Sequence, residues 1–443
     1  MTSLPTYKRI WQISQPLMIG LLAEHIVGVV DTAFLGHVGD LELASAAIAG
    51  IFYFVLFVVG MGFGIGTQIL IARRNGEKNY NKIGGIFENS LYFIWIFSAI
   101  IIAFSFIFSR NILGYLLNSE NILGASMRYL NIRIFTLFFS LGCVIMRSFF
   151  VGIQLTKYIG IGAFIVAATN FVFDYLLIFG KFGFPEMGLD GAALACVIAE
   201  IAGFTYYVFI IIKKIDLNKY SLFKFRKPQM QIVAHTMKLS IFTMLQNLIS
   251  MGVWFLFFIV IEKTGEKNLA ASNIIRSFYI LMLCPLWAYG SAVSTLVSNA
   301  IGAKQRRYVF LIIKRVTSFG LITSIVVFIP ILVSAKGIMS LYTSNTELID
   351  IGFRAMYVVG MANILASISW IVFSAISATG NTKIALYLES GTLFIYLFFV
   401  YYFAKNFPNR LEIIWLSENI YSFLLGIVSI LYLRSKHWVK KEI

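Results

Sequence analysis

The stretch from residue 44 to residue 71 reads ASAAIAGIFYFVLFVVGMGFGIGTQILI and contains no charged residue. A helix needs about 20 apolar residues to cross the hydrocarbon core of a bilayer, so this stretch is long enough to span it. The strands of a membrane β-barrel are only about ten residues long and alternate apolar with polar residues, which this stretch does not do. The stretch therefore predicts a transmembrane helix.

The rest of the chain has the same character. Of its 443 residues 59% are hydrophobic and 13% are charged, and the mean hydropathy is +0.84, which excludes an ordinary soluble protein. We count twelve comparable stretches, near residues 11–36, 44–71, 84–108, 124–149, 158–180, 188–212, 232–261, 268–300, 309–334, 349–378, 383–404 and 412–433. The predicted fold class is an all-α membrane protein with twelve transmembrane helices.

Basic residues are distributed unequally between the two sides of the predicted membrane. Arg73, Arg74, Lys213 and Lys214 exemplify the larger group, which lies on the side of both termini. Because cytoplasmic loops carry an excess of Lys and Arg, both termini are predicted to be cytoplasmic. The expected location is a bacterial cytoplasmic (inner) membrane, and the net charge of +16 then reflects topology and anionic lipid rather than nucleic acid.

The chain contains an internal repeat. An offset of 226 residues pairs Gly39 with Gly265 and Gly64 with Gly290, and later an offset of 228 pairs Gly124 with Gly352, Tyr129 with Tyr357 and Gly152 with Gly380. The predicted domains are an N-lobe at residues 1–213, a cytoplasmic linker at 214–230 and a C-lobe at 231–443. Two lobes of six helices each imply an axis along the membrane normal and a central cavity with alternating access.

Two carboxylates are predicted at the same depth in the N-lobe. Asp31 lies about five residues from the outer end of its span and Asp174 about six, so at 1.5 Å per residue their depths agree. Asn170 lies one turn from Asp174, and Tyr129 can reach the same level. Two close carboxylates cannot both ionise easily in a low dielectric, so the pair should take up a proton or a sodium ion. The alternative is that Asp31 caps or packs a helix irregularity and that Asp174 hydrogen-bonds a neighbouring backbone.

Five further intramembrane residues are candidates for function. Glu24, on nearly the same helix face as Asp31, is either a relay or a group in a wet cavity, and Glu200 either attracts a cationic substrate or pairs with an arginine such as Arg133. Pro16 either bends the first span or shapes its entry. Arg276 needs a partner, for which Glu389 is the best candidate by depth, as a structural ion pair or a gate.

Three stretches resemble the multidrug and toxic-compound extrusion (MATE) family, and their order and spacing carry the resemblance over nearly the whole chain. They are VDTAFLGH at 30–37, NFVFD at 170–174 and GLDGAALA at 188–195. The resemblance implies a secondary active antiporter that exports organic cations or drugs in exchange for protons or sodium ions. One branch of the family couples through an N-lobe site that corresponds here to Asp31, Asn170 and Asp174, with Tyr129 used in some members.

The resemblance also implies a bend of the first span at Pro16. Another branch uses acids in the C-lobe, but here the corresponding stretches, LQNLIS at 245–250 and NILAS at 363–367, contain none. The departure favours N-lobe coupling.

Other functions receive less support from the sequence. A flippase for a lipid-linked or anionic amphipathic substrate, from the same wider superfamily, stays open because Arg128, Arg133, Arg147 and Arg276 could bind phosphates. An enzyme is not expected, since no acidic cluster for magnesium and no phosphate-binding glycine loop is present. We therefore expect no cofactor apart from the coupling ion, a monomer, and a cationic amphipathic small molecule as substrate.

Overall fold

The computed structural model describes residues 5–440, which fold into helices joined by short turns. Its helices are α1 (Tyr7–Val38), α2 (Asp40–Gly76), α3 (Asn81–Leu116), α4 (Glu120–Arg133), α5 (Thr136–Gly152), α6 (Lys157–Ile178), η1 (Lys181–Gly183), α7 (Gly188–Lys214), α8 (Leu217–Tyr220), α9 (Met230–Glu262), α10 (Glu266–Gly302), η2 (Arg306–Tyr308), α11 (Val309–Ser340), α12 (Thr346–Ala378), α13 (Thr382–Asn406), α14 (Leu411–Arg434) and η3 (His437–Lys440). Within this range eleven helices are long and apolar enough to cross a membrane, and α4 with α5 makes a twelfth, bent span. The all-α multi-span fold is therefore confirmed. The predicted lobes also include residues 1–4 and 441–443, which lie outside the described residues.

The chain forms two compact units. One, which we call the N-unit, is Gln15–Met244, and the other, the C-unit, joins the chain up to Ser14 with Leu245 onward. The division falls inside α1 and α9, so these two helices each belong to both units. The predicted linker at residues 214–230 lies within the N-unit and contains the short helix α8.

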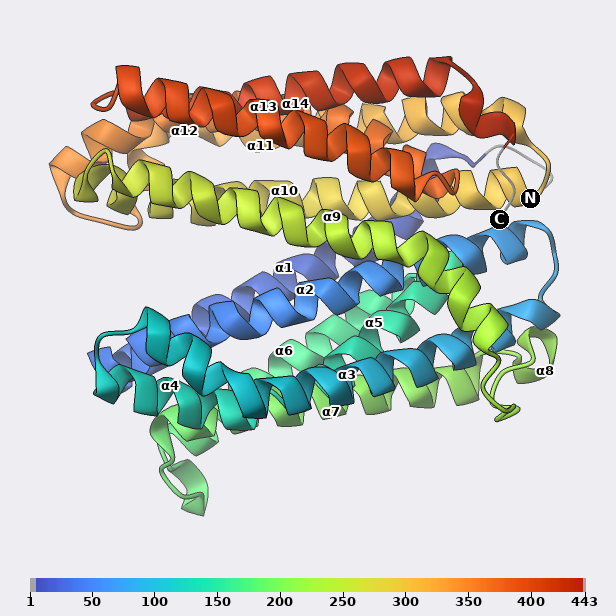
Figure 1. The fold of residues 1–443 in the computed structure, drawn as a ribbon, viewed down its shortest axis with the longest axis horizontal. Coiled ribbons are helices and arrows are strands. Elements are labelled where there is room, and N and C mark those ends of the chain that lie inside the picture. The colour runs from blue at the N-terminus through green and yellow to red at the C-terminus, as the bar shows by residue number, and fades with distance from the viewer. Residues whose placement is uncertain (1–4, 441–443) are drawn as a thin grey trace. The chain divides into compact units, whose positions relative to one another are not determined.

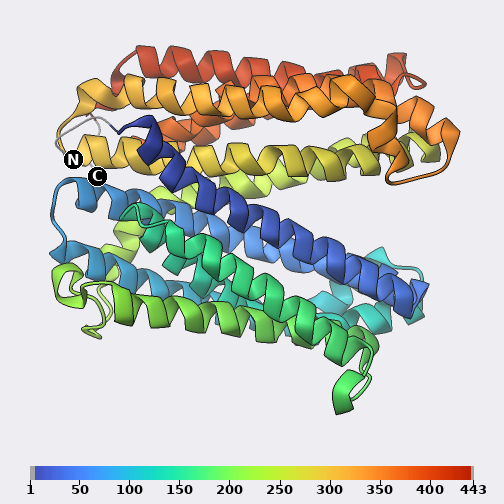
Figure 2. The same cartoon turned by 180° about the vertical axis from the view of Figure 1, so that it is seen from behind.

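Close helix packing builds the N-unit. α2 packs on α5, and α6 packs on α7. The two green ribbons of α6 and α7 run side by side in Figure 2. Glycine makes the first contact possible, because a Cβ atom at Gly64 would lie 2.3 Å from Cγ1 of Val144. Gly62 likewise lets α2 approach α9, since a Cβ there would lie 2.6 Å from Cα of Met244.

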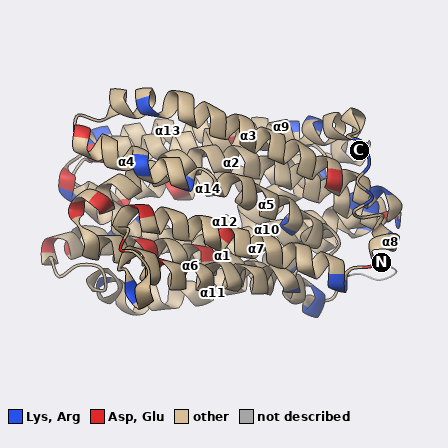
Figure 3. Ribbon diagram, turned by 90° about the horizontal axis from the view of Figure 1, so that it is seen from below, with Lys and Arg blue, Asp and Glu red and all other residues tan. Residues whose placement is uncertain are grey.

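The linker is hydrogen-bonded to the N-terminal part of α3, beside α8 (Figure 1). The backbone N–H of Lys224 donates to Oε1 of the buried Glu88 at 2.8 Å, and that of Gln229 donates to Oδ1 of Asn89 at 2.6 Å. A Cβ atom at Gly84 would lie 2.2 Å from the carbonyl oxygen of Ser221, so only glycine allows this approach. Figure 3 shows Lys and Arg gathered around this end of the unit, near α8.

The C-unit is built around α12, which packs against α10, α11 and α14. Its interior is aromatic and aliphatic. Phe257 of α9, Tyr396 of α13 and Trp415 of α14 are all fully or nearly fully buried, and the rings of Phe257 and Trp415 meet edge to face with centroids 4.9 Å apart.

The fourth span is not the single straight helix predicted at residues 124–149. α4 and α5 meet at a bend of 47°. The hydroxyl of Thr136 donates to the carbonyl oxygen of Arg133 at 2.7 Å, and Phe135 and Phe138 donate their N–H groups to residues only three positions back. Such side-chain bonding and tight turns bend a helix.

The backbone of both units bears out the internal repeat, with one correction. Lys78 and Lys304 both have positive φ at equivalent turns, and a Cβ at Gly290 would meet Trp370 and Ser374 just as one at Gly64 meets their counterparts Val144 and Ser148. From Gly124 onward the offset is still 226 rather than 228, because the left-handed residue matching Gly380 is Gln154 and not Gly152. The helix caps Ser119 and Asn345 agree with this offset. Below, matched positions are those that differ by 226.

Candidate functional site

The predicted carboxylates come together inside the N-unit. Asp31 of α1 is 8% exposed, and Asn170 and Asp174 of α6 are 1% and 0% exposed. The two acids are within hydrogen-bonding reach of each other. The structure therefore gathers the three residues that the sequence placed at one depth.

Asn170 ties the two acids together. With its amide oriented by its hydrogen-bond network, Nδ2 donates to Oδ1 of Asp31 at 2.8 Å and to Oδ2 of Asp174 at 3.1 Å. Oδ1 of Asp174 is buried and receives no hydrogen bond from any donor among the described residues. Two carboxyl groups within hydrogen-bonding reach of each other are most stable when they share one proton.

A guanidinium group on α4 supplies positive charge next to the acids. Arg133 lies close enough to Asp31 and Asp174 to attract both electrostatically. It also donates to the hydroxyl of Tyr129 and lies 5.2 Å above the ring of Tyr53. Tyr129 is therefore near the predicted site, with its hydroxyl turned to Arg133.

Two members of this site were not predicted from the sequence. The thiol of Cys196 on α7 lies 3.7 Å from Oδ2 of Asp31. Arg133 is predicted as a partner of Glu200 or as a phosphate ligand, and not as a neighbour of Asp31 and Asp174. Its spacing of four residues after Tyr129 placed both on one helix face and was the available signal. Nothing in the sequence distinguishes Cys196 from the other buried cysteines, Cys143 and Cys284.

Glu24 and Glu200 belong to a second charged group in the N-unit, around Arg147 of α5. Arg147 forms an ion pair with Glu24, whose side chain is 45% exposed. Among the basic groups near Glu200, Arg147 attracts it more strongly than Arg133, and the thiol of Cys143 also bonds to it. Both arginines therefore attract Glu200, and Arg147 does so more strongly than the predicted partner Arg133.

Pro16 lies inside α1, which begins at Tyr7 and runs on to Val38. It is therefore not a residue of the first turn, where proline only shapes the entry of a helix. A Cβ at Gly160 of α6 would lie 3.2 Å from the carbonyl oxygen of Pro16, so the two helices touch here. The border between the units, after Ser14, is next to this proline.

The structure does not bring Arg276 and Glu389 together, although their depths suggested a pair. The guanidinium of Arg276 lies 5.0 Å from the ring centroid of Phe258. Glu389 is 2% exposed and accepts a hydrogen bond from the hydroxyl of Ser250 at 2.8 Å. Depth fixes the level of a residue in its helix but not the direction in which its side chain points.

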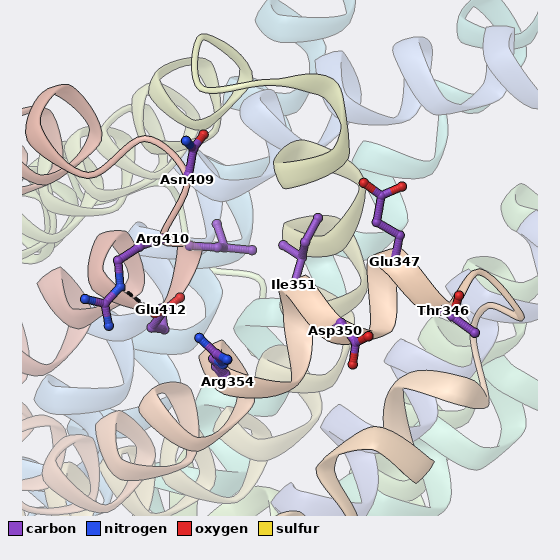
Figure 4. Close-up of a pocket in the computed structure, with 9 residues that line it drawn as sticks. Thr346, Glu347, Asp350, Ile351, Arg354, Asn409, Arg410 and Glu412 are labelled. Carbon is purple, nitrogen blue, oxygen red and sulfur yellow. Dashed lines mark hydrogen bonds and ion pairs between the residues drawn. The ribbon is translucent and has the colours of Figure 1, made fainter.

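A pocket of about 470 Å³ lies in the C-unit, where α12 and α14 begin (Figure 4). Its wall is charged and includes Glu347, Asp350 and Arg354, together with the ion pair of Arg410 and Glu412 at 3.0 Å. None of the predicted coupling residues lines it. Its polar, open wall does not resemble the apolar surface that an amphipathic substrate requires.

Comparisons with known proteins agree with this architecture. The model of the family described as MatE matches the chain twice, at residues 16–176 and 243–403. The chain is 24% identical to a probable multidrug resistance protein NorM of Thermotoga maritima, over 98% of this chain and 94% of the relative. It is also 24% identical to the multidrug export protein MepA of Staphylococcus aureus, over 89% of this chain and 87% of the relative.

A solved structure shows the same fold. It is a mutant of the Vibrio cholerae MATE transporter VcmN, and it superimposes with a TM-score of 0.91, covering 98% of each chain at 20% identity. The twofold match of the family model follows the internal repeat, and the matched residues include Asp31, Asn170 and Asp174. The chain therefore belongs to the MatE family of multi-pass membrane transporters.

Proposed function

We propose that this protein is a secondary active antiporter, which exports organic cations or drugs by alternating access and takes its energy from an inward ion gradient. The observation that carries the proposal is the buried pair of Asp31 and Asp174 bridged by Asn170. Ionisable groups this deep in a membrane helix bundle are costly and are typical of ion pathways. The names of the relatives, multidrug resistance and export proteins, support the same class of substrate.

The geometry favours a proton over sodium as the coupling ion. Sodium needs oxygen ligands, whereas the hydrogen-bond network directs the amide nitrogen of Asn170, and not its oxygen, at both carboxylates. A proton shared by Asp31 and Asp174 requires no such ligand. In this proposal Asn170 orients the two acids, and Arg133 and Tyr129 lie beside them and fix their positions. A cationic substrate competes with the proton for the acidic site.

The cycle follows from the charge of the acid pair. When a proton occupies the pair, the site is less negative and releases a cation, and when the proton leaves, the site attracts the next one. With both termini in the cytoplasm of a bacterial inner membrane, the acids lie nearer the outer side. Protons entering from outside would then displace the substrate outward. The monomer contains all residues that this cycle uses.

The test is transport in energised membrane vesicles with a fluorescent organic cation. Asp31→Asn, still inserted and folded, should reduce ion-driven efflux to that of vesicles without the protein. A pH gradient alone should drive the wild type, and a sodium gradient alone should not. Efflux retained in Asp31→Asn would remove the acid pair from the mechanism, whereas efflux driven only by sodium would keep the pair and replace the coupling ion.

The flippase remains the alternative function. However, two of the four arginines that could bind its phosphate groups interact with other side chains of the N-unit. Arg147 is paired with Glu24, and Arg133 is bonded to Tyr129 and attracted by Asp31. A phosphate site needs cationic groups that are not already neutralised. Export of a fluorescent lipid-linked anion, with no export of cations, would favour the flippase.

A further inference from the structure

The linker of the N-unit carries an exposed phenyl ring among basic side chains. The ring belongs to Phe225, which is 76% exposed. Lys224, Arg226 and Lys227 flank it and are exposed as well. The ion pairs found among the described residues all involve other basic residues, so these three cations are not neutralised there. An aromatic ring between uncompensated positive charges is typical of a segment at a membrane–water interface.

The exposed ring stands on a fixed base. Phe225 stacks on Phe223, with ring centroids 6.1 Å apart. The ring of Phe223 in turn meets that of the buried Phe87 of α3 edge to face, at 6.5 Å. Between the two linker rings, the backbone N–H of Lys224 donates to Oε1 of Glu88 at 2.8 Å. The contacts with α3 therefore hold the linker so that the ring of Phe225 is directed outward.

The backbone of this segment is strained. Ser221, Phe223 and Phe225 have φ angles of 52°, 52° and 44°, in the left-handed region that bulky side chains rarely adopt. Such strain persists only where the surroundings determine it, and it is concentrated in functional segments. Phe87 provides such surroundings for Phe223. Most of the ring of Phe225 has no protein around it, so a group outside the described residues must favour its position.

The sequence of α3 gives the level of this segment in the bilayer. Between Asn89 and Arg110 lie residues 90–109, which include no charged residue and match the roughly 20 residues that cross a hydrocarbon core. Asn89 therefore lies at one edge of the core. Its Oδ1 accepts from the backbone N–H of Gln229 at 2.6 Å. The linker thus runs at the boundary between hydrocarbon and headgroups, on the side that is predicted to be cytoplasmic.

The surroundings of the ring add a cation and an apolar group but no available acid. Lys219 of α8 is exposed, and Met230, the first residue of α9, is 72% exposed. The acids closest to the segment accept from backbone N–H groups, Glu88 from that of Lys224 and Asp216 from that of Lys219. Figure 3 shows the resulting concentration of basic residues near α8. The surface therefore complements a group that combines negative charge with an apolar part.

We propose that residues 219–230 bind the headgroup of an anionic phospholipid in the cytoplasmic leaflet. The segment has four basic residues and no acid. Lys224, Arg226 and Lys227 bind the lipid phosphate, and Phe225 inserts at the start of the acyl chains. An acidic protein would complement the charges but not an apolar ring at the bilayer boundary. The site depends on the predicted orientation of the chain and not on the proposed transport cycle.

The first test maps lipid contacts on the full-length protein in nanodiscs. The probe is a photoactivatable phosphatidylglycerol, compared with the same analogue of phosphatidylcholine, and mass spectrometry locates the cross-links. We expect cross-links within residues 219–230, about tenfold more with phosphatidylglycerol. Arg226→Gln combined with Lys227→Gln should reduce them about tenfold or more, because each cation near an anionic surface contributes a factor of about five. Arg306→Gln combined with Arg307→Gln, the same loss of charge in the C-unit, should leave them unchanged.

The second test measures the depth of the ring. Phe225→Cys carries a spin label, and the native cysteines Cys143, Cys196 and Cys284 are buried. With phosphatidylglycerol the label should be accessible to oxygen rather than to a water-soluble nickel chelate, and with phosphatidylcholine alone the order should reverse.

Three results would overturn the proposal. They are equal cross-linking by the two lipids, cross-links in the linker that survive the loss of Arg226 and Lys227, and a label that stays in water with phosphatidylglycerol. Suppression of the cross-links by inorganic phosphate at the concentration of the lipid would likewise replace the lipid by a soluble anion. Both linker variants change only exposed side chains, so we expect them to fold.

Discussion

At three matched positions the two units of this chain have opposite chemistry. The N-unit has Asp31, Asn170 and Asp174, and the C-unit has Phe257, Tyr396 and Val400. The first set forms a hydrogen-bonded acid pair, whereas the rings of Phe257 and Tyr396 pack with centroids 6.0 Å apart in a closed core. The same backbone thus holds a buried acid pair in one unit and a packed core in the other.

The difference extends to the helix that faces these residues. Thr136, whose hydroxyl bonds to the carbonyl oxygen of Arg133 at the bend between α4 and α5, is matched by Ala362 in the continuous helix α12. Arg133 itself is matched by Val359, which is buried. The glycines and turns that set the backbone are repeated, and a few interior side chains decide which unit carries the acid pair.

Placing the N-unit residue of one matched pair into the C-unit should have the largest effect. Val400→Asp puts a carboxylate into the aromatic core beside Tyr396, without an amide or guanidinium partner, and should destabilise the protein by about 3–5 kcal/mol. The thermal midpoint Tm of the purified protein measures this, with Val400→Thr as the control of similar size. A Tm equal to that of the wild type would show that the C-unit tolerates an acid as well as the N-unit does.

Substitutions at the matched residues Asn170 and Tyr396 should separate an effect on transport from an effect on stability. Asn170→Ala removes the donor to both acids and should abolish efflux. Tyr396→Phe removes the 2.8 Å hydrogen bond to Glu418 and should cost about 1–3 kcal/mol of folding free energy while efflux continues. Efflux and denaturant unfolding of both variants are compared. Loss of efflux in Tyr396→Phe would make the C-unit core part of the transport mechanism.

The attachment of the linker is particular to the N-unit, since Gly84 is matched by Phe310. Gly84→Ala would force a Cβ into the carbonyl of Ser221 and should destabilise the protein by about 1–3 kcal/mol. Gly85→Ala is the control, because its Cβ would meet only Cδ1 of Ile232, at an ordinary 3.4 Å. Equal unfolding curves for the two variants would contradict the close contact.

The smallest difference is expected at the matched helix caps. Asn345 accepts from two backbone N–H groups, of Glu347 at 3.0 Å and Leu348 at 3.4 Å, whereas Ser119 accepts from one, of Ile122 at 3.4 Å. Asn345→Ala should cost about 1 kcal/mol and Ser119→Ala less. Chemical denaturation measures both, and the reverse order would show that the cap of α4 carries more stability than its geometry suggests.

The sequence predicted the spans well because length and hydropathy determine which segments enter a membrane. It could not show the bend in the fourth span, which depends on where the hydroxyl of Thr136 points. The depths of Asp31 and Asp174 followed from counting residues along their helices, and the structure places the two acids together. Depth alone failed for Arg276 and Glu389, since it does not give the rotation of a helix about its axis.

The repeat was found in sequence, but its offset was wrong by two residues from Gly124 onward. Glycine and tyrosine are common in this chain, so identities among them can align at more than one register. Backbone features resolve the register, because the left-handed turn at Gln154 and that at Gly380 occupy one structural position with different residues. Cys196 could not be recognised from the sequence either, because cysteine packs in apolar cores as readily as it lines a polar site.

The fastening of the linker has a mechanical consequence. Since Glu88 and Asn89 hold the backbone just before α9, and Ser240 donates to the carbonyl oxygen of Phe63 at 3.2 Å, the first turns of α9 are anchored in the N-unit. A loop held this way cannot serve as a hinge. Any rearrangement between the halves must be absorbed by flexing of α1 and α9, near Pro16 and Met244, where each helix passes from one unit to the other.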